Sequence, residues 1–266
     1  MSKLLTHLPA LCNMVKRTAL EAGEITLDYF EEGMQIAADI KADGSPVTIA
    51  DKRAEEYIIR ALQDAVPGIP VIGEEANAAG ERHDLKGQEY FWLVDPLDGT
   101  KEYAMGSPDY TVNIALIKNN TPVLGVIYAP AHGELFSAHG EGTAVRWLEE
   151  TNNEKPIRVR KPSAKGLVVI ASKNRSAAEI DKYLEEHKVE KIIRKGSSLK
   201  ICAVAMGKAD LYPGLAETCE WDTAAGHAIL NAAGGEIVAL DNGQVLTYGD
   251  KDGHFNNPKF LAQAKF

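Results

Sequence analysis

The chain has 266 residues, of which 45% are hydrophobic and 25% charged, so it is long and apolar enough to bury a substantial core and is not a disordered chain. A formal net charge of −9 offers no basic surface for a phosphate backbone, which argues against binding a nucleic-acid polymer. Three separated cysteines, Cys12, Cys202 and Cys219, form no Cys-x-x-Cys pair and indicate neither a disulfide framework nor a zinc site.

Helices dominate the start of the chain. Across residues 8–30, apolar side chains recur three or four positions apart, which predicts one long helix. The same spacing predicts a second helix that begins near Thr48 and ends at Pro67-Gly68, before a short strand at 71–72. The opening residues lack the apolar core of a signal peptide, and no window has the length of a membrane span, so we expect a cytoplasmic protein.

Strands follow, and they favour an α+β first domain covering residues 1–160. Short runs of apolar and β-favouring residues, separated by turn residues, predict an antiparallel meander. These runs lie at 91–94, 110–117, 123–128 and 135–136.

The remaining residues, 161–266, predict a second domain of the α/β class that completes the site. Strand and helix patterns alternate here, as they do in units with parallel strands. The expected strands lie at 167–171, 191–193, 211–212 and 236–240, and the expected helices at 177–186, 199–206 and 223–233.

The residues that carry most chemical information follow the apolar strand at 91–94, in the segment Asp95-Pro96-Leu97-Asp98-Gly99-Thr100. Two carboxylates at the end of a buried strand are unfavourable unless they are hydrogen-bonded or bind a cation. Magnesium prefers such hard oxygen ligands, and Gly99 permits close approach of a phosphate to the backbone. Taken alone, the segment is equally well explained as an Asp-rich turn before a capped helix.

Two more acids occur in similar positions. Glu74 follows the short strand at 71–72 and lies beside Asp95 if the two strands are neighbours. Asp222 begins a predicted helix whose small residues, 224–226, allow close packing. The plainer alternatives are a solvated loop glutamate for Glu74 and an N-cap for Asp222.

Together, Ile72-Gly73-Glu74-Glu75, the segment 95–100 and Trp221-Asp222-Thr223-Ala224-Ala225-Gly226 resemble the inositol monophosphatase superfamily over nearly the whole chain. The resemblance implies a layered α-β-α-β-α sandwich and a lithium-sensitive, Mg²⁺-dependent phosphatase. It also implies metal ligation by Glu74, Asp95, the Leu97 carbonyl, Asp98 and Asp222.

Within the superfamily, Lys101-Glu102-Tyr103 and Gly196-Ser197-Ser198-Leu199-Lys200 are similar to the 3′(2′),5′-bisphosphate nucleotidase (CysQ) branch. This resemblance implies hydrolysis of the 3′-phosphate of 3′-phosphoadenosine 5′-phosphate to AMP, in support of sulfate assimilation and nucleotide recycling. Gly214 departs from both groups, because inositol phosphatases carry an acid in this stretch and many CysQ relatives an arginine. The alternatives are an inositol-1-phosphate or sugar-phosphate phosphatase, and a binding protein without turnover.

The resemblance also pairs Asp51 with Thr100, which we expect to orient and deprotonate the attacking water. The alternative for Asp51 is a capping box, because Thr48-Ile49-Ala50-Asp51 fits the Ser/Thr-x-x-acid pattern before a helix. The two roles are compatible, since a cap places its side chain rigidly. Asp43 is a weaker candidate for an outer metal position.

The expected substrate is a small phosphonucleotide that binds at two places. Leu97, Asp98, Gly99, Thr100 and Asp222 would face the reacting phosphate. Ser197, Ser198 and Lys200 form a polar, cationic turn that suits a second, non-reacting phosphate. The alternative for this turn is helix capping with an exposed lysine. A homodimer and peripheral attachment to the cytoplasmic face of the inner membrane are left open.

Overall fold

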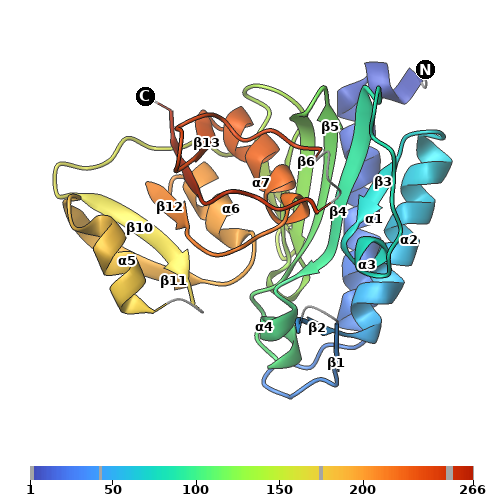
Figure 1. The fold of residues 1–266 in the computed structure, drawn as a ribbon, viewed down its shortest axis with the longest axis horizontal. Helices are drawn as coiled ribbons and strands as arrows, with labels where there is room; N and C mark the ends of the chain where they lie inside the picture. The colour runs from blue at the N-terminus through green and yellow to red at the C-terminus, as the bar shows by residue number, and fades with distance from the viewer. Residues whose placement is uncertain (1–2, 42–43, 174–175, 250–253, 266) are drawn as a thin grey trace.

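The computed structural model describes residues 3–41, 44–173, 176–249 and 254–265. Its elements stack in five layers, in which two sheets alternate with three layers of helices (Figure 1). This is the α-β-α-β-α sandwich that the resemblance implied. No helix in the described ranges is both long and apolar enough to cross a lipid bilayer.

The first helical layer consists of α1 (Leu8–Leu27) and α2 (Ile49–Ala65), close to the predicted bounds. A short 3-10 helix, η1 (Lys3–Thr6), precedes them. Thr48 caps α2 in a complete capping box with Asp51, as its sequence predicts. Both helices bury an apolar face against the first sheet, and the capping box fixes where α2 begins.

The first sheet has seven strands in the order β3-β4-β5-β6-β7-β8-β9. β3 pairs with β4 in parallel, and the other pairs are antiparallel, so the predicted meander is confirmed and β8 and β9 extend it. The bounds are β3 Val71–Gly73, β4 Tyr90–Asp98, β5 Thr111–Lys118, β6 Thr121–Ala129, β7 Glu134–Ala138, β8 Val145–Leu148 and β9 Asn153–Pro156.

Short elements connect this sheet to its surroundings. β1 (Asp39–Ile40) and β2 (Pro46–Val47) form a small separate hairpin before α2. α3 (Glu74–Ala78) follows β3 directly, and α4 (Thr100–Ala104) follows β4. A 3-10 turn, η2 (Pro130–His132), joins β6 to β7.

The central layer consists of α6 (Leu199–Ala205) and α7 (Glu220–Ala232), which lie between the two sheets (Figure 1). Small residues let these helices pack closely. A Cβ atom at Gly125 on β6 would stand 2.3 Å from the Ala225 carbonyl oxygen. One at Gly226 would stand 2.9 Å from the Ile201 side chain of α6. The close approach predicted for the segment 224–226 is therefore confirmed.

The second sheet has the order β11-β10-β12-β14-β13, and α5 (Ala177–Leu184) covers its outer face. β10 is parallel to β11 and β12, as the alternation of strands and helices predicts, whereas β14 runs antiparallel between β12 and β13. The bounds are β10 Leu167–Ser172, β11 Val189–Lys195, β12 Leu211–Gly214, β13 Gly235–Ala239 and β14 Phe260–Ala264.

One hydrophobic cluster fills the space between the two sheets and contains residues of both, from Ile72 in β3 to Ala262 in β14. It includes apolar side chains from both sides of residue 160, because α6 and α7 pack against the first sheet as well as the second. The division into regions 1–160 and 161–266 stays a prediction. In the structure the two regions share a core.

Candidate active site

The acids predicted from separate motifs converge where β3 and β4 end. Glu74 is the first residue of α3, directly after β3, and Asp95 lies within β4. Because β3 and β4 are parallel neighbours, their carboxyl ends meet at one edge of the sheet. Asp95 is only 1% exposed, and the Leu97 amide donates a hydrogen bond of 2.9 Å to its Oδ1 atom.

The segment 95–98 is not a turn. β4 continues through Asp98, and its pairing with β5 is irregular between Asp95 and Asp98. Asp95 lies opposite Asn113, and Asp98 opposite Thr111. The one extra residue on β4 bends the strand at this point and brings both carboxylates to the site. The interpretation as an Asp-rich turn is therefore wrong.

Asp222 arrives from the other half of the chain. α7 begins at Glu220, three residues before the predicted start, so Cys219 is its N-cap and Asp222 is not. The Cys219 amide donates to Asp222 Oδ2 at 2.8 Å, which fixes the carboxylate. Glu74, Asp95 and Asp222 each place an oxygen within 4.8 Å of the others. Three elements that are distant in sequence thus form one carboxylate cluster.

The burial and close spacing of these acids disfavour their ionised forms. Burial raises the pKa of Asp95 well above its ordinary value, and the charges of Glu74 and Asp98 add to that effect. Burial and the neighbouring charge of Asp98 also raise the pKa of Asp222 well above normal. Like charges at such separations disfavour ionisation unless a cation lies between them.

The donor set fits magnesium. All of the candidate ligands are oxygen atoms, which Mg²⁺ prefers, and no imidazole or thiolate belongs to the group of three acids. Asp98 and the Leu97 carbonyl lie beside this group on the same bent strand. The residues present therefore fit the ion that the resemblance implies.

A lysine of the protein already offsets part of this negative charge. Lys41 Nζ lies 2.6 Å from Glu74 Oε1 and 2.5 Å from Glu75 Oε1. Burial alone would lower the pKa of Lys41, but the charges of Glu74 and Glu75 outweigh it and raise that pKa. Sequence reasoning assigned no role to Lys41, because an isolated lysine carries no motif. Its neighbour Asp43 lies outside the described residues.

Asp51 and Thr100 meet as predicted. Thr100 Oγ1 lies 3.2 Å from Asp51 Oδ1 and 3.1 Å from the Leu97 carbonyl oxygen. The other carboxylate oxygen of Asp51 accepts hydrogen bonds from the amide and hydroxyl of Thr48. The capping box and the contact with Thr100 therefore coexist. Burial raises the pKa of Asp51, which makes its carboxylate a better proton acceptor.

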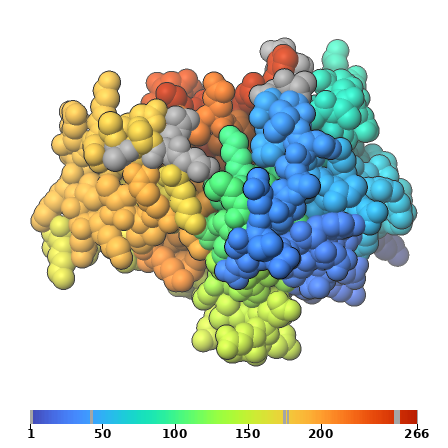
Figure 2. All heavy atoms as spheres, turned by 90° about the horizontal axis from the view of Figure 1, so that it is seen from below, coloured from blue at the N-terminus to red at the C-terminus, as the bar shows by residue number. Residues whose placement is uncertain are grey.

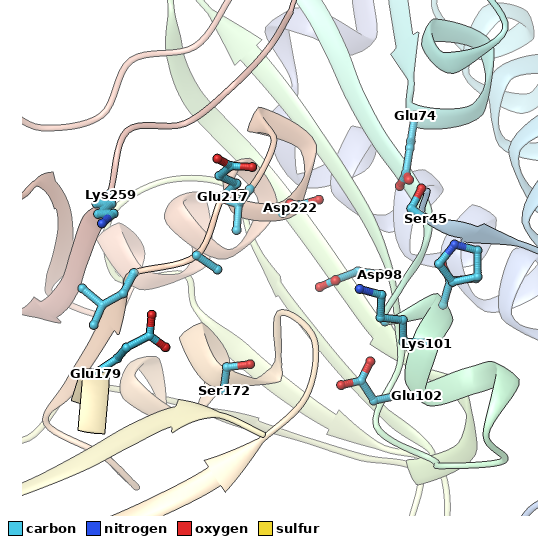
Figure 3. Close-up of a pocket in the computed structure, with 16 residues that line it drawn as sticks. Ser45, Glu74, Asp98, Lys101, Glu102, Ser172, Glu179, Glu217, Asp222 and Lys259 are labelled. Atoms are coloured by element: carbon cyan, nitrogen blue, oxygen red, sulfur yellow. The ribbon is translucent and has the colours of Figure 1, made fainter. Parts of the chain in front are cut away.

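A cavity of about 710 Å³, here called the main pocket, opens over these residues. Its lining residues come from both halves of the chain. Seen from below, the blue N-terminal region and the yellow and orange region lie on either side of a green segment (Figure 2). Figure 3 shows Glu74 and Asp98 on one side, with Ser172 and Glu102 below. Its charged lining residues are Glu74, Asp98, Glu102, Glu179, Glu217, Asp222, Lys101 and Lys259. An anion enters such an acidic pocket only with the help of cations.

A second cavity of about 50 Å³, here called the annex, shares Asp98, Thr218 and Asp222 with the main pocket. Ser197, Ser198 and Lys200 line it. The turn predicted to hold a second phosphate thus lies next to the carboxylate cluster, although it is largely buried.

The side chains of this turn also have partners within the protein. Lys200 Nζ donates to the Ser197 carbonyl, and burial lowers its pKa despite the nearby charge of Asp98. The Ser198 hydroxyl lies 2.6 Å from Asp98 Oδ2 and 2.8 Å from the Asp222 carbonyl oxygen, and donates its one proton to either. Asn113 donates to the same hydroxyl at 2.9 Å. Ser198 therefore helps to hold Asp98 and Asp222 in place. Lys200 is buried, so it is not the exposed lysine of the alternative interpretation.

Comparison with known proteins gives a consistent result over almost the whole chain. A family model described as the inositol monophosphatase family matches residues 10–265. A protein of Escherichia coli named 3′(2′),5′-bisphosphate nucleotidase CysQ is 40% identical over 250 residues, which cover 94% of this chain and 98% of that protein.

Solved structures agree with these sequence matches. The crystal structure of CysQ from Bacteroides thetaiotaomicron, described as a bacterial member of the inositol monophosphatase family, has a TM-score of 0.80 and 36% identity. That match covers 97% of this chain and 98% of the other. An inositol monophosphatase from Anabaena has a TM-score of 0.71 and 27% identity, and covers 97% and 91%.

Proposed function

The chain belongs to the inositol monophosphatase family, and we propose that within it this protein is a 3′(2′),5′-bisphosphate nucleotidase. Its substrate is 3′-phosphoadenosine 5′-phosphate, and its products are AMP and inorganic phosphate. The observation that carries the proposal is the annex, because it gives a second phosphate a cationic place beside the carboxylate cluster. The same activity would recycle the nucleotide left by sulfate assimilation.

Magnesium is the proposed metal, held by Glu74, Asp95, Asp98, Asp222 and the Leu97 carbonyl. When bound, it offsets the charge of these acids and of the phosphate and makes the attack of water on phosphorus easier. The supporting observation is the raised pKa of Asp95, which burial causes first and the charges of neighbouring acids increase.

Asp51 and Thr100 are the proposed proton acceptors. The Thr100 hydroxyl donates a hydrogen bond to Asp51, and its oxygen can accept one from the attacking water, so Thr100 takes up the water proton as it passes its own proton to Asp51. Thr48 holds the Asp51 carboxylate in this orientation. A positioned base of this kind typically contributes about 10²- to 10⁴-fold in rate.

Gly214 is compatible with this assignment. A Cβ atom there would stand 2.4 Å from the Phe260 ring, so neither an acid nor an arginine fits without moving that ring. The acid that inositol phosphatases carry in this stretch is therefore absent at Gly214. Lys200, which lines the annex together with Phe260, is the proposed cation for the second phosphate.

The test is a comparison of phosphate release from 3′-phosphoadenosine 5′-phosphate, inositol 1-phosphate and fructose 1,6-bisphosphate at equal enzyme concentration. We expect the highest specificity constant for the nucleotide. A preference for inositol 1-phosphate would overturn the nucleotidase assignment and leave the metal chemistry intact. Cytoplasmic location, inhibition by lithium, a homodimer and membrane attachment stay predictions.

A further inference from the structure

Asn257 contributes to neither cavity, yet it contacts the residues on both sides of Asp222. Its Nδ2 atom lies within 3.2 Å of three acceptors, which are Thr218 Oγ1, the Cys219 carbonyl and Thr223 Oγ1. Its backbone amide also donates to the Thr218 carbonyl at 2.8 Å. One residue therefore holds the chain immediately before α7 and the first turn of that helix.

The orientation of the Asn257 amide follows from these partners. A carbonyl oxygen can only accept a hydrogen bond, so the atom that faces Cys219 must be the NH₂ group. Thr218 Oγ1 and Thr223 Oγ1 also face this NH₂ group, whose two protons are shared among the three acceptors. Thr223 donates its own proton to the Glu220 carbonyl at 3.3 Å.

Thr218 differs from Thr223 in one respect. Throughout the part of the chain that the structure describes, the Thr218 hydroxyl proton meets no acceptor. Thr218 also lines both the main pocket and the annex, where Lys200 lies. Its proton is thus available to an anion that enters the annex.

We propose that Asn257 is a positioning residue that aligns Asp222 for the metal and Thr218 for the non-reacting phosphate. The amide of Cys219 fixes the Asp222 carboxylate, and the carbonyl of the same residue accepts a hydrogen bond from Asn257. Loss of the Asn257 hydrogen bond should therefore weaken the contact between Cys219 and Asp222. Partners of metal ligands commonly change metal affinity by about 10- to 100-fold when removed. The Thr218 part of the proposal rests on the proposed function, and the Asp222 part does not.

The experiment uses three variants of the full chain. Asn257→Ala removes the side-chain hydrogen bonds to Thr218, Cys219 and Thr223, and Thr218→Val removes only the Thr218 hydroxyl. Asn13→Ala is the control for the loss of an asparagine side chain, because Asn13 is exposed on α1, outside both cavities. Magnesium is titrated while tryptophan fluorescence is followed, since one of the three tryptophans, Trp221, is buried and adjacent to Asp222. Melting temperatures without metal report on the fold.

We expect Asn257→Ala to raise the magnesium midpoint about tenfold or more, and the other two variants to leave it unchanged. Thr218→Val should lower the specificity constant for 3′-phosphoadenosine 5′-phosphate about tenfold, and that for adenosine 3′-phosphate less than about twofold, because a hydrogen bond to a charged group is lost. Asn257→Ala should show both losses.

An unchanged magnesium midpoint in Asn257→Ala, with only a lower melting temperature, would reduce Asn257 to a structural residue and overturn the proposal. Equal losses on the two substrates in Thr218→Val would overturn the role of Thr218. If the wild type shows no preference for the bisphosphate, the proposed function fails, whereas the magnesium titration still decides the role of Asn257.

Discussion

Asp98 differs from the other acids of the site because a neutral hydroxyl, Ser198 Oγ, lies 2.6 Å from its carboxylate. We expect Asp98→Asn to keep the fold, since an amide preserves the shape and can still accept from Ser198. It should nevertheless lower turnover by about a hundredfold or more, because an amide lacks the anionic oxygen that magnesium favours.

The measurement is turnover against magnesium concentration for wild type and Asp98→Asn. Asp181→Asn, on an exposed position of α5, serves as the control. A near-normal rate for Asp98→Asn at ordinary magnesium levels would show that Asp98 only shapes the strand end.

His227 makes stability depend on pH. It is fully buried in α7, its Nδ1 atom lies 2.9 Å from the Tyr248 hydroxyl, and burial lowers its pKa to about 4. The unfolded chain takes up this proton below about pH 6.5, whereas the folded chain does so only near pH 4. Stability is therefore lost as the pH falls from about 6.5 toward 4, by about 3 kcal/mol in full.

The variant His227→Gln cannot titrate in this range. Urea unfolding without metal, at about pH 7.5 and about pH 5, should show the free energy of wild type falling by about 2 kcal/mol more than that of the variant. An equal fall in both proteins would mean that His227 is not the titrating group.

At the level of elements, α7 depends on the absence of a side chain at Gly125. A methyl group there would stand 2.3 Å from the Ala225 carbonyl oxygen, so Gly125→Ala must push α7 away from β6. We expect a destabilisation of about 1–3 kcal/mol, together with weaker magnesium binding because Asp222 moves with its helix. Melting temperature and a magnesium titration measure the two effects.

Thr121→Ala, an exposed change on the same strand, is the control for Gly125→Ala. If Gly125→Ala lowered the melting temperature and left magnesium affinity unchanged, α7 would be able to move without displacing Asp222.

Most elements follow from local patterns, since α1, α2 and the strands from β3 to β7 have the periodicity and turn residues that predict them. β8, β9 and β14 were not predicted. β8 and β9 consist of partly or fully exposed residues, and β14 alternates in burial but is only five residues long. β14 in particular is defined by its two neighbours, which lie far away in the sequence.

The acids of the site were predictable because they occur in motifs, but their surroundings were not. Nothing in the sequence links Lys41 to Glu74, or Asn257 to Cys219, since these pairs meet only through tertiary folding. The start of α7 was misplaced for a related reason. Cys219 is a weak capping residue by type, and its role depends on the side chain of Asp222.

For the molecule as a whole, we expect magnesium to act on stability as well as on activity. The proposed ligands come from β4, α3 and α7, so a cation bound among them would favour the assembled sandwich. At a concentration about 100 times the dissociation constant, the expected gain is about 2.7 kcal/mol. A chelator should abolish activity, and added magnesium should restore both activity and melting temperature.

Sodium chloride at matched ionic strength is the control, because it screens charge without occupying the cluster. Full activity in metal-free buffer would contradict the proposed mechanism, whatever the change in melting temperature.

The position of β14 bears on how the protein is made. Residues 260–264 lie between β12 and β13, inside the second sheet, so this sheet cannot close while those residues are still within the ribosome. The N-terminal helices and the first sheet can form earlier, because their contacts are nearer in sequence. A nascent chain interrupted before residue 260 would display two bare strand edges to its neighbours. Chaperones or proteases would thus recognise incomplete copies by the unpaired edges of β12 and β13.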